Sequence, residues 1–338
     1  QFSGESRRAF FYTFDPMKKV AILVPESSVV QATADPQYCF KAVNQFFQMS
    51  GRDPLFDIRL VGMRPAVDLS DGTYTVHVDS VITNDDIYDL VFIPAIFGDL
   101  DQALTRNERN IAWIKMQYDN GAELASLCLG AFLLASTGLL EGKKCSTHWG
   151  FQEQFKKMFP NVNIQDGNII TEEHRIYSSG GATSYWNLLI HLVEKYADRA
   201  TAILIAKYFA IDIERDNQSL FAIFQGQKNH HDEPILQAQD LIENSIDSKL
   251  TIEQIADKVA LGRRSLERRF RQATNNSVLE YIQRVKIEAA KRRFELGTQN
   301  INEVMLEVGY TDDKAFRTTF KKITGLTPVE YRKKYQRN

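Results

Sequence analysis

Cys128 is the side chain in this sequence whose position best suits it for chemistry. It stands where the apolar run 124–127 stops and a helix is expected to begin, and Gly130 permits a sharp turn between the two. A thiol in that position faces backbone amides at the start of a helix, which favour the thiolate and lower the thiol pKa. Three interpretations stay open: Cys128 lines a ligand pocket in a catalytically silent domain, it is an inert thiol, or it is a nucleophile or redox sensor.

A nucleophile needs a second group that moves protons, and the sequence near Cys128 offers few. His148 is such a group in principle, but a histidine beside Trp149 is more often structural or part of a pocket wall. We therefore expect no catalytic residue. We expect instead a small-molecule pocket lined by Cys128, Leu129, His148 and Ser179.

A second set of chemically active side chains is basic and lies in the last hundred residues. Apolar residues recur at helical spacing over 301–308, Gly309 ends the pattern, and Asp312 is a plausible N-cap for the next helix. Helix, turn and basic helix occur once more over 250–273, and a long helix over 278–296 joins the two units. This order is typical of helix-turn-helix readers of the DNA major groove. By spacing, the last basic helix turns inward Ala315, Phe316, Thr319, Phe320 and Ile323, and outward Lys314, Arg317, Lys321 and Lys322.

Charge is distributed unevenly along the chain. Residues 251–338 hold 19 Lys and Arg against 11 Asp and Glu, so their net charge is about +8. The whole chain has a net charge of −2, which leaves about −10 on residues 1–250. A basic domain on an acidic body indicates a polyanionic partner such as double-stranded DNA.

The elements that must position Cys128 alternate between strand and helix. Apolar runs predict strands at 20–24, 56–61, 90–94 and 123–127, and amphipathic stretches predict helices at 40–49 and 106–119. This alternation predicts a parallel sheet covered by helices on both faces.

The C-terminal stretch VGYTDDKAFRTTFKKITGLTPVEYR, residues 308–332, resembles the signature of the AraC-type DNA-binding domain, and the resemblance covers 235–338. It implies two reading helices that enter successive major grooves about 34 Å apart. Arginine pairs with guanine, glutamate accepts from cytosine, and outer lysines contact phosphates. The residues that the resemblance places on DNA are Arg263, Arg264, Glu267, Arg268, Arg271, Asp313, Lys314, Arg317, Thr318 and Lys321.

The stretches 124–149 and 178–196 resemble the PfpI/ThiJ-type amidotransferase-like domain, over about residues 18–215. That domain followed by an AraC-type domain is the arrangement of the GlxA-like transcriptional regulators, whose elbow and THW pattern appears here as Cys128 and 147–149. The resemblance implies an α/β fold: a flavodoxin-like parallel-sheet sandwich of the class I glutamine amidotransferase type. An all-α domain with two helix-turn-helix units follows it.

The chain departs from the enzymes of that superfamily at two places. Hydrolytic members carry a histidine directly after the elbow cysteine, where this chain has Leu129. Redox or deglycase-type members carry a glutamate on the loop after the first strand, where this chain has Gln31 or Ala32, with Glu26 too early. Both departures weigh against covalent turnover at the thiol.

We expect a cytoplasmic, sequence-specific DNA-binding transcriptional regulator that is not an enzyme. Its amidotransferase-like domain would sense an unknown small-molecule effector and form a homodimer, with no cofactor and no membrane partner. One alternative is a PfpI-type cysteine-dependent hydrolase or redox enzyme tethered to DNA. The other is a structural DNA-binding protein whose amidotransferase-like domain no longer responds to any small molecule. Dimerisation would place two bipartite sites in the operator.

The expected domain boundaries follow composition. Residues 1–16 form a leader or disordered extension, 17–224 the sensing domain, 225–234 a polar linker, and 235–338 the DNA-binding domain. His230, His231 and Asp232 lack further ligands at metal-binding spacing, so no metal is expected. The three cysteines are too few for a disulfide framework, which favours a reducing compartment.

Overall fold

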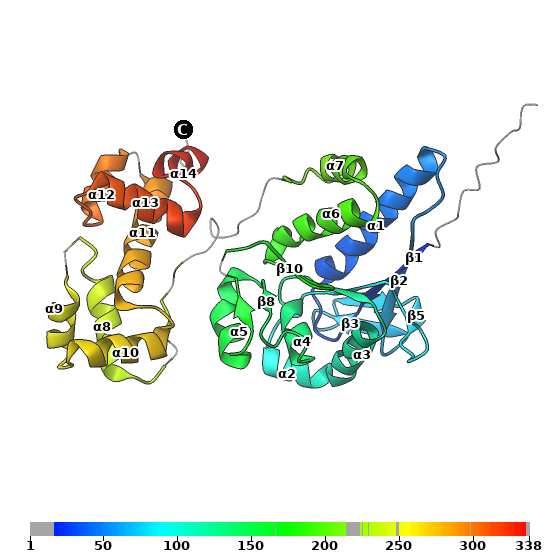
Figure 1. The fold of residues 1–338 in the computed structure, drawn as a ribbon, viewed down its shortest axis with the longest axis horizontal. Helices are drawn as coiled ribbons and strands as arrows, with labels where there is room; N and C mark the ends of the chain where they lie inside the picture. Colours follow the sequence, from blue (N-terminus) through cyan, green and yellow to red (C-terminus); the bar gives the residue numbers. More distant parts are fainter. Residues whose placement is uncertain are drawn as a thin grey trace, which may run out of the picture. The chain divides into compact units, whose positions relative to one another are not determined.

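The computed structural model describes residues 17–165, 167–213, 224, 226–228, 230–247, 250–297 and 299–335. The expected extension over 1–16 lies outside the described residues, as do two residues of the expected linker, 225 and 229. The chain divides into two compact units (Figure 1). The first contains 1–147, 161–163 and 170–215, and the second contains 148–160, 164–169 and 216–338.

The first unit is built on a mostly parallel sheet of seven strands within the described residues. The order across the sheet is β10-β11-β7-β6-β1-β2-β5, and only the pairing of β10 with β11 is antiparallel. The strands are β1 Lys18–Leu23, β2 Phe56–Gly62, β5 Ser80–Val81, β6 Leu90–Ile93, β7 Glu123–Ser126, β10 Ile170–Glu173 and β11 Ile176–Ser179. The expected strand runs at 20–24 and 90–94 are buried throughout because helices cover both sides of the sheet, whereas β2 is only partly buried and exposes Arg59.

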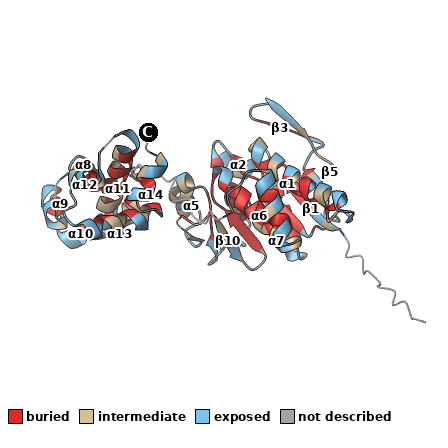
Figure 2. Ribbon diagram, turned by 90° about the horizontal axis from the view of Figure 1, so that it is seen from above, coloured by how far each residue is buried: buried red, intermediate tan, exposed pale blue. Residues whose placement is uncertain are grey.

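Two groups of helices cover the sheet (Figure 1). On one face pack α1 Val30–Met49, α6 Tyr185–Tyr196 and α7 Arg199–Tyr208. On the other pack α2 Leu100–Arg106, α3 Glu108–Asp119 and α4 Gly130–Ser136. Figure 2 colours the buried residues red, and they occur in the sheet and in the helices that pack on it. The predicted parallel-sheet sandwich is confirmed. The helix expected over 40–49 is longer, because α1 begins at Val30 and contains Pro36 within its length.

Shorter elements complete the chain before the C-terminal helices. A two-stranded ribbon pairs β3 Ala66–Leu69 with β4 Tyr74–His77, and another joins β8 Lys144–Cys145 to β9 Asn163–Ile164. The stretch after His148 forms a short 3-10 turn, η1 Trp149–Phe151, and α5 Gln152–Met158; η2 Ala182–Ser184 precedes α6. No helix among the described residues is long and apolar enough to span a membrane.

The C-terminal helices form two small cores that share one long helix. The helices are α8 Glu233–Glu243, α9 Ile252–Lys258, α10 Arg263–Thr274, α11 Val278–Leu296, α12 Ile301–Glu307, α13 Asp313–Thr324 and α14 Pro328–Tyr335. The first half of α11 packs with α8, α9 and α10, and its second half with α12, α13 and α14. The predicted all-α domain with two helix-turn-helix units is confirmed.

The two helix-turn-helix units repeat one another in local detail. The first helix of each unit begins with a capping box, in which the N-cap residue is Thr251 for α9 and Asn300 for α12. The capping box satisfies free backbone amides at the start of the helix. Each reading helix, α10 or α13, spans 12 residues and ends at a residue with a left-handed backbone, Asn275 or Gly325. These signals are local, which is why the helix boundaries follow from sequence.

Residues 224 and 226–228, here called the strap, lie against α8 and α11. The ring of Phe224 packs edge-on against Tyr281 with centroids 5.1 Å apart, and its N–H donates to Glu288 at 3.2 Å. Gln227 accepts hydrogen bonds from α8 and from Asn276, which lies just before α11. Lys228 pairs with two carboxylates of α8 at 2.7 Å each. Part of the expected linker therefore packs on the C-terminal helices.

Candidate nucleic-acid interface and the Cys128 turn

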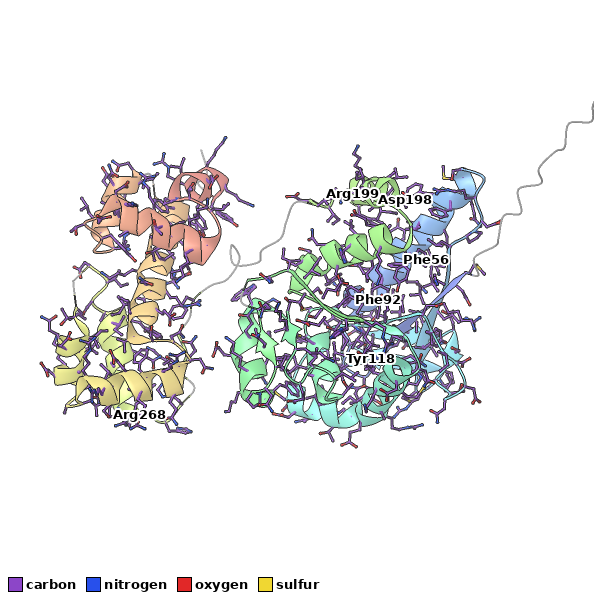
Figure 3. All side chains as sticks on the ribbon, viewed as in Figure 1. Phe56, Phe92, Tyr118, Asp198, Arg199 and Arg268 are labelled. Atoms are coloured by element: carbon purple, nitrogen blue, oxygen red, sulfur yellow. The ribbon has the colours of Figure 1, made fainter. Side chains whose placement is uncertain are left out.

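The reading helix α10 buries one face and exposes a basic one. Leu266, Phe270 and Thr274 are buried against the first helical core. Arg264, Arg268 and Arg271 are exposed at spacings of four and three residues, so they form one stripe along the helix. Figure 3 labels Arg268 on the outer side of α10. Among the described residues these three guanidinium groups have no hydrogen-bond or ion-pair partner, so they are available to an external anion.

The reading helix α13 repeats this arrangement fifty residues later. Phe316, Phe320 and Thr324 are buried, and the exposed stripe at the matching positions is Lys314, Thr318 and Lys321. We call the two rows, Arg264-Arg268-Arg271 and Lys314-Thr318-Lys321, the reading stripes. Of the ten residues assigned to DNA contact from the sequence, eight are exposed, and Glu267 and Arg317 are partly buried. Their contact with DNA stays a prediction.

Ala315 is exposed, so the expectation that it faces the core is wrong. Its direction lies closer to that of Thr318 than to the buried row of Phe316 and Phe320, because a helix turns about 100° per residue. Ala315 is therefore a further contact candidate, and its position on the helical wheel beside the stripe is the signal that identifies it. A small apolar side chain beside a reading stripe suits contact with a thymine methyl group.

The first and fifth positions of the two reading helices carry the same ion pair with the charges exchanged. In α10, the Nε of Arg263 lies 3.2 Å from a carboxylate oxygen of Glu267, and Arg263 also pairs with Glu253 of α9. In α13, the Nε of Arg317 donates to both carboxylate oxygens of Asp313, at 2.7 and 2.8 Å. Exposed ion pairs of this kind contribute little to stability because solvent screens them, so either arginine can exchange its partner for a base or a phosphate.

Arg269, the one arginine of α10 not assigned to DNA, anchors the helix. Its guanidinium donates two hydrogen bonds to the Asp232 carboxylate, at 2.6 and 2.9 Å, and these hold the pKa of Asp232 below its usual range. Asp232 also caps α8, and His230 bonds Gln239 at 3.0 Å. Among the described residues, no group of three or more His, Cys, Asp or Glu side chains is arranged to hold a metal ion.

Cys128 lies in the expected sharp turn between β7 and α4. Its φ of +54° is left-handed, a conformation that costs energy for a residue with a side chain. Two hydrogen bonds hold the turn: the Cys128 N–H donates to the Ser179 Oγ at 3.3 Å, and the Thr147 Oγ1 donates to the Cys128 carbonyl at 3.1 Å. At Gly130 a Cβ would lie 2.3 Å from the Ile93 carbonyl oxygen, so only glycine lets α4 approach β6 this closely.

The structure brings together three of the four residues expected at a pocket: Cys128, Leu129 and Ser179. His148 belongs to the second compact unit, where its ring contacts Trp149 and Phe151. Burial lowers the pKa of His148, which keeps its imidazole neutral near pH 7.

The expectation that the turn lowers the Cys128 pKa is wrong. Burial raises the pKa of the thiol, and the backbone N–H groups of Ala182 and Leu129, which donate toward the sulfur, offset only part of that effect. Glu26 does not supply the missing base, because it pairs with Arg64 at 3.2 Å and its backbone is bonded to Asn107. The donor from Ala182 lies more than fifty residues away along the chain, where no local pattern signals it.

Comparison with known proteins adds two matches to this geometry. Residues 8–195 match the DJ-1/PfpI family, and residues 255–334 match a helix-turn-helix domain. The chain is 24% identical over 234 residues to the HTH-type transcriptional regulator GbdR of Pseudomonas aeruginosa (strain UCBPP-PA14), which covers 69% of this chain and 63% of that regulator. It is 21% identical over 217 residues to the HTH-type transcriptional regulator GlxA of Rhizobium meliloti, covering 63% of this chain and 66% of the relative.

A solved structure supports the same fold. The crystal structure of a putative transcriptional regulator protein from Vibrio parahaemolyticus superimposes with a TM-score of 0.51 and 18% identity, covering 57% of this chain and 99% of that one. At this identity the likeness concerns the fold alone. The match to GbdR spans 63% of that regulator's length, somewhat less than two thirds.

Proposed function

We propose that this chain, which belongs to the DJ-1/PfpI family and carries an AraC-type helix-turn-helix domain, is a transcriptional regulator that binds specific double-stranded DNA through both of its reading helices. The observation that carries the proposal is the pair of reading stripes. Each presents exposed polar side chains at matching positions of a helix whose other face is buried. The relatives GbdR and GlxA, both named as transcriptional regulators, support it.

The charges suit the two tasks of a DNA reader. Arg264, Arg268 and Arg271 have no partner among the described residues and can bind phosphates or guanine edges. Arg263 and Arg317 each pair with a carboxylate of the same helix, which orients the guanidinium until a base or a phosphate replaces that partner. Glu267 and Asp313 repel phosphates and can accept from cytosine, so they favour base discrimination over plain affinity.

For the first unit we propose a sensing role in a homodimer in the cytoplasm. Cys128 follows the carboxyl end of β7 in an open parallel sheet, and that edge is where such sheets bind small molecules. Cys128, Leu129 and Ser179 form one wall of the proposed site. A protonated thiol without a bonded base supports recognition in preference to turnover. An effector that binds one arrangement of the dimer more tightly would shift its engagement of DNA.

The first experiment is selection of genomic DNA fragments by the wild type and by Arg317→Ala, at two salt concentrations. The wild type is expected to enrich one short bipartite sequence. Loss of the Arg317 guanidinium should weaken binding to it by about 1–3 kcal/mol, roughly 5- to 150-fold, and relax the preference at one base pair.

Lys333→Ala is the matched control for that selection. Lys333 is also an exposed cation of the same domain, but it lies on α14 and outside the reading stripes. This variant should keep the wild-type sequence preference. Equal, sequence-indifferent and strongly salt-dependent binding by all three proteins would contradict the proposal.

A further inference from the structure

We propose that Gly309 and Lys286 fix the spacing between the two DNA elements that this chain reads. Gly309 forms the turn between α12 and α13, and Lys286 lies in the middle of α11, between the two helical cores. Both touch the boundary between the first and the second helix-turn-helix unit. This inference rests on the proposed function, because spacing has meaning only for a protein that reads DNA with both units.

The turn at Gly309 packs against the backbone of the first unit. A Cβ on Gly309 would lie 2.8 Å from the Asp247 carbonyl oxygen and 2.9 Å from the Ile246 carbonyl oxygen, in the segment that follows α8. Backbone atoms cannot swing aside as the end of a long side chain can. The second unit therefore approaches the first more closely at this turn than any residue with a side chain would allow.

The chain contains its own comparison for this turn. Ala260 holds the equivalent position between α9 and α10, with a left-handed φ of +53° against +73° at Gly309. Ala260 is exposed, so its methyl group is tolerated there. A left-handed backbone alone does not require glycine in this turn. The close approach to Ile246 and Asp247 accounts for the glycine at 309.

Lys286 holds the same turn from the other side. Its side chain is buried at 8% exposure, and its Nζ donates to the Gly309 carbonyl at 3.3 Å. The ammonium also lies 5.8 Å from the centre of the Tyr310 ring. Ile246 packs against both helical cores, so the two units share one apolar contact beside this polar one.

These contacts determine how far α13 can rotate relative to α10 about the shared helix α11. Two reading helices must enter successive major grooves, about 34 Å apart, for both to contact base edges. A small change of angle at the junction moves α13 along or around the DNA. Specificity for the distance between the two elements is therefore set at residues that touch no base.

The test uses the full chain and the bipartite sequence that the wild type selects, rebuilt with its two elements separated by up to two base pairs more or fewer. The wild type is expected to prefer one spacing strongly. Gly309→Ala should weaken binding at that spacing by about tenfold, comparable to one mismatched base pair, and flatten or shift the spacing profile. Ala260→Gly is the matched control and should keep the wild-type profile.

Lys286→Met provides a second variant that keeps most of the side-chain volume and removes the hydrogen bond to Gly309. It should flatten the spacing profile in the same way, with circular dichroism reporting that the helices remain. If Gly309→Ala folds and keeps the wild-type profile, the inference is overturned. If Gly309→Ala does not fold, a wild-type profile in Lys286→Met overturns it instead.

The same experiment distinguishes failure of the proposed function from failure of this inference. In that case the wild type itself selects no bipartite sequence, and no spacing series can be built. A wild type with one preferred spacing and variants that share it would refute only the role of Gly309 and Lys286.

Discussion

At the scale of single residues, two effects act on the Cys128 thiol in opposite directions. The N–H groups of Leu129 and Ala182 point toward the sulfur and favour its charged form, whereas burial at 7% exposure disfavours it. Desolvation is the larger effect, so the pKa of Cys128 is raised. Burial also raises the pKa of Cys39, and that of Cys145 to about 12.

The first prediction concerns thiol reactivity. Because Cys128 is buried and its pKa is raised, the Cys128 thiol of the native chain should react with iodoacetamide at pH 8 more slowly than the same thiol in urea, where cysteine titrates near 8.5. The raised pKa also makes the free energy of unfolding depend on pH. The contribution of the protonated Cys128 thiol is fully present below the pKa of cysteine in the unfolded chain, and it is lost as the pH rises through the pKa of the folded thiol. Mass spectrometry of labelled peptides separates the three cysteines.

The control for this measurement is Cys128→Ser, which removes only that site and should leave the labelling of Cys39 and Cys145 unchanged. Labelling of native Cys128 faster than that of free cysteine would contradict the burial argument. It would show that the two backbone amides dominate, and the thiol-enzyme alternative would then gain support.

At the scale of elements, the strap joins α8 to α11 within the first helix-turn-helix unit. Gly226 has a left-handed φ of +72°, and a Cβ there would lie 2.5 Å from the Tyr281 hydroxyl and 3.0 Å from a Glu243 carboxylate oxygen. The Tyr281 hydroxyl donates to that same oxygen at 2.6 Å. The strap thus packs over a partly buried hydrogen bond between two helices.

We predict that Gly226→Ala destabilises the C-terminal helices by about 2–4 kcal/mol, through the strained backbone and the displaced tyrosine. Gly325→Ala is the control, because Gly325 has a similar φ of +81° but nothing within 4 Å of its Cβ position. It should cost only the backbone strain, about 1–2 kcal/mol. Urea unfolding followed by circular dichroism compares the two. Equal losses would mean that the strap contact contributes nothing.

The elements that could be predicted from sequence are those whose signals are local. The boundaries of α9 and of α11 to α13 follow from capping boxes, left-handed caps and helical spacing, all within a few residues of each boundary. The start of α1 was missed because Pro36 reads as a helix breaker. The strap was missed because its partners, Tyr281 and Glu243, are distant in sequence.

At the candidate site, too, the local features were predictable from sequence and the features that depend on packing were not. The turn at Cys128 was predictable from a strand end followed by Gly130, but the balance between burial and hydrogen bonding was not. Burial is a property of the packed fold, and Ala182 arrives from a distant segment. The exposed face of α13 was predicted except at Ala315, whose apolar side chain suggested the core although its direction lies closer to Thr318 than to Phe316 and Phe320.

At the scale of the whole molecule, a net charge of about +8 on residues 251–338 is joined to about −10 on residues 1–250. Salt dependence of DNA binding should therefore reflect the cations of the helical region alone. The reading stripes hold five of them: Arg264, Arg268, Arg271, Lys314 and Lys321.

We predict a slope of log K against log salt concentration of about −4.5 if one chain neutralises five phosphates, and about −9 if two chains bind together. Fluorescence anisotropy across a salt series gives the slope, and light scattering gives the mass of the protein that binds. A slope near −9 with twice the mass of one chain supports the proposed homodimer. A slope near zero would exclude phosphate contact by the stripes.

The exchanged ion pairs of the reading helices have a consequence for direction. Arg263 with Glu267 and Asp313 with Arg317 occupy matching positions with opposite charges, so under the proposed function we expect the two helices of one chain to prefer different bases. The two DNA elements that one chain binds would then differ in base sequence. Under the proposed function, each reading helix of a bound chain would then occupy one particular element of the bipartite sequence, and exchanging the two elements should weaken binding.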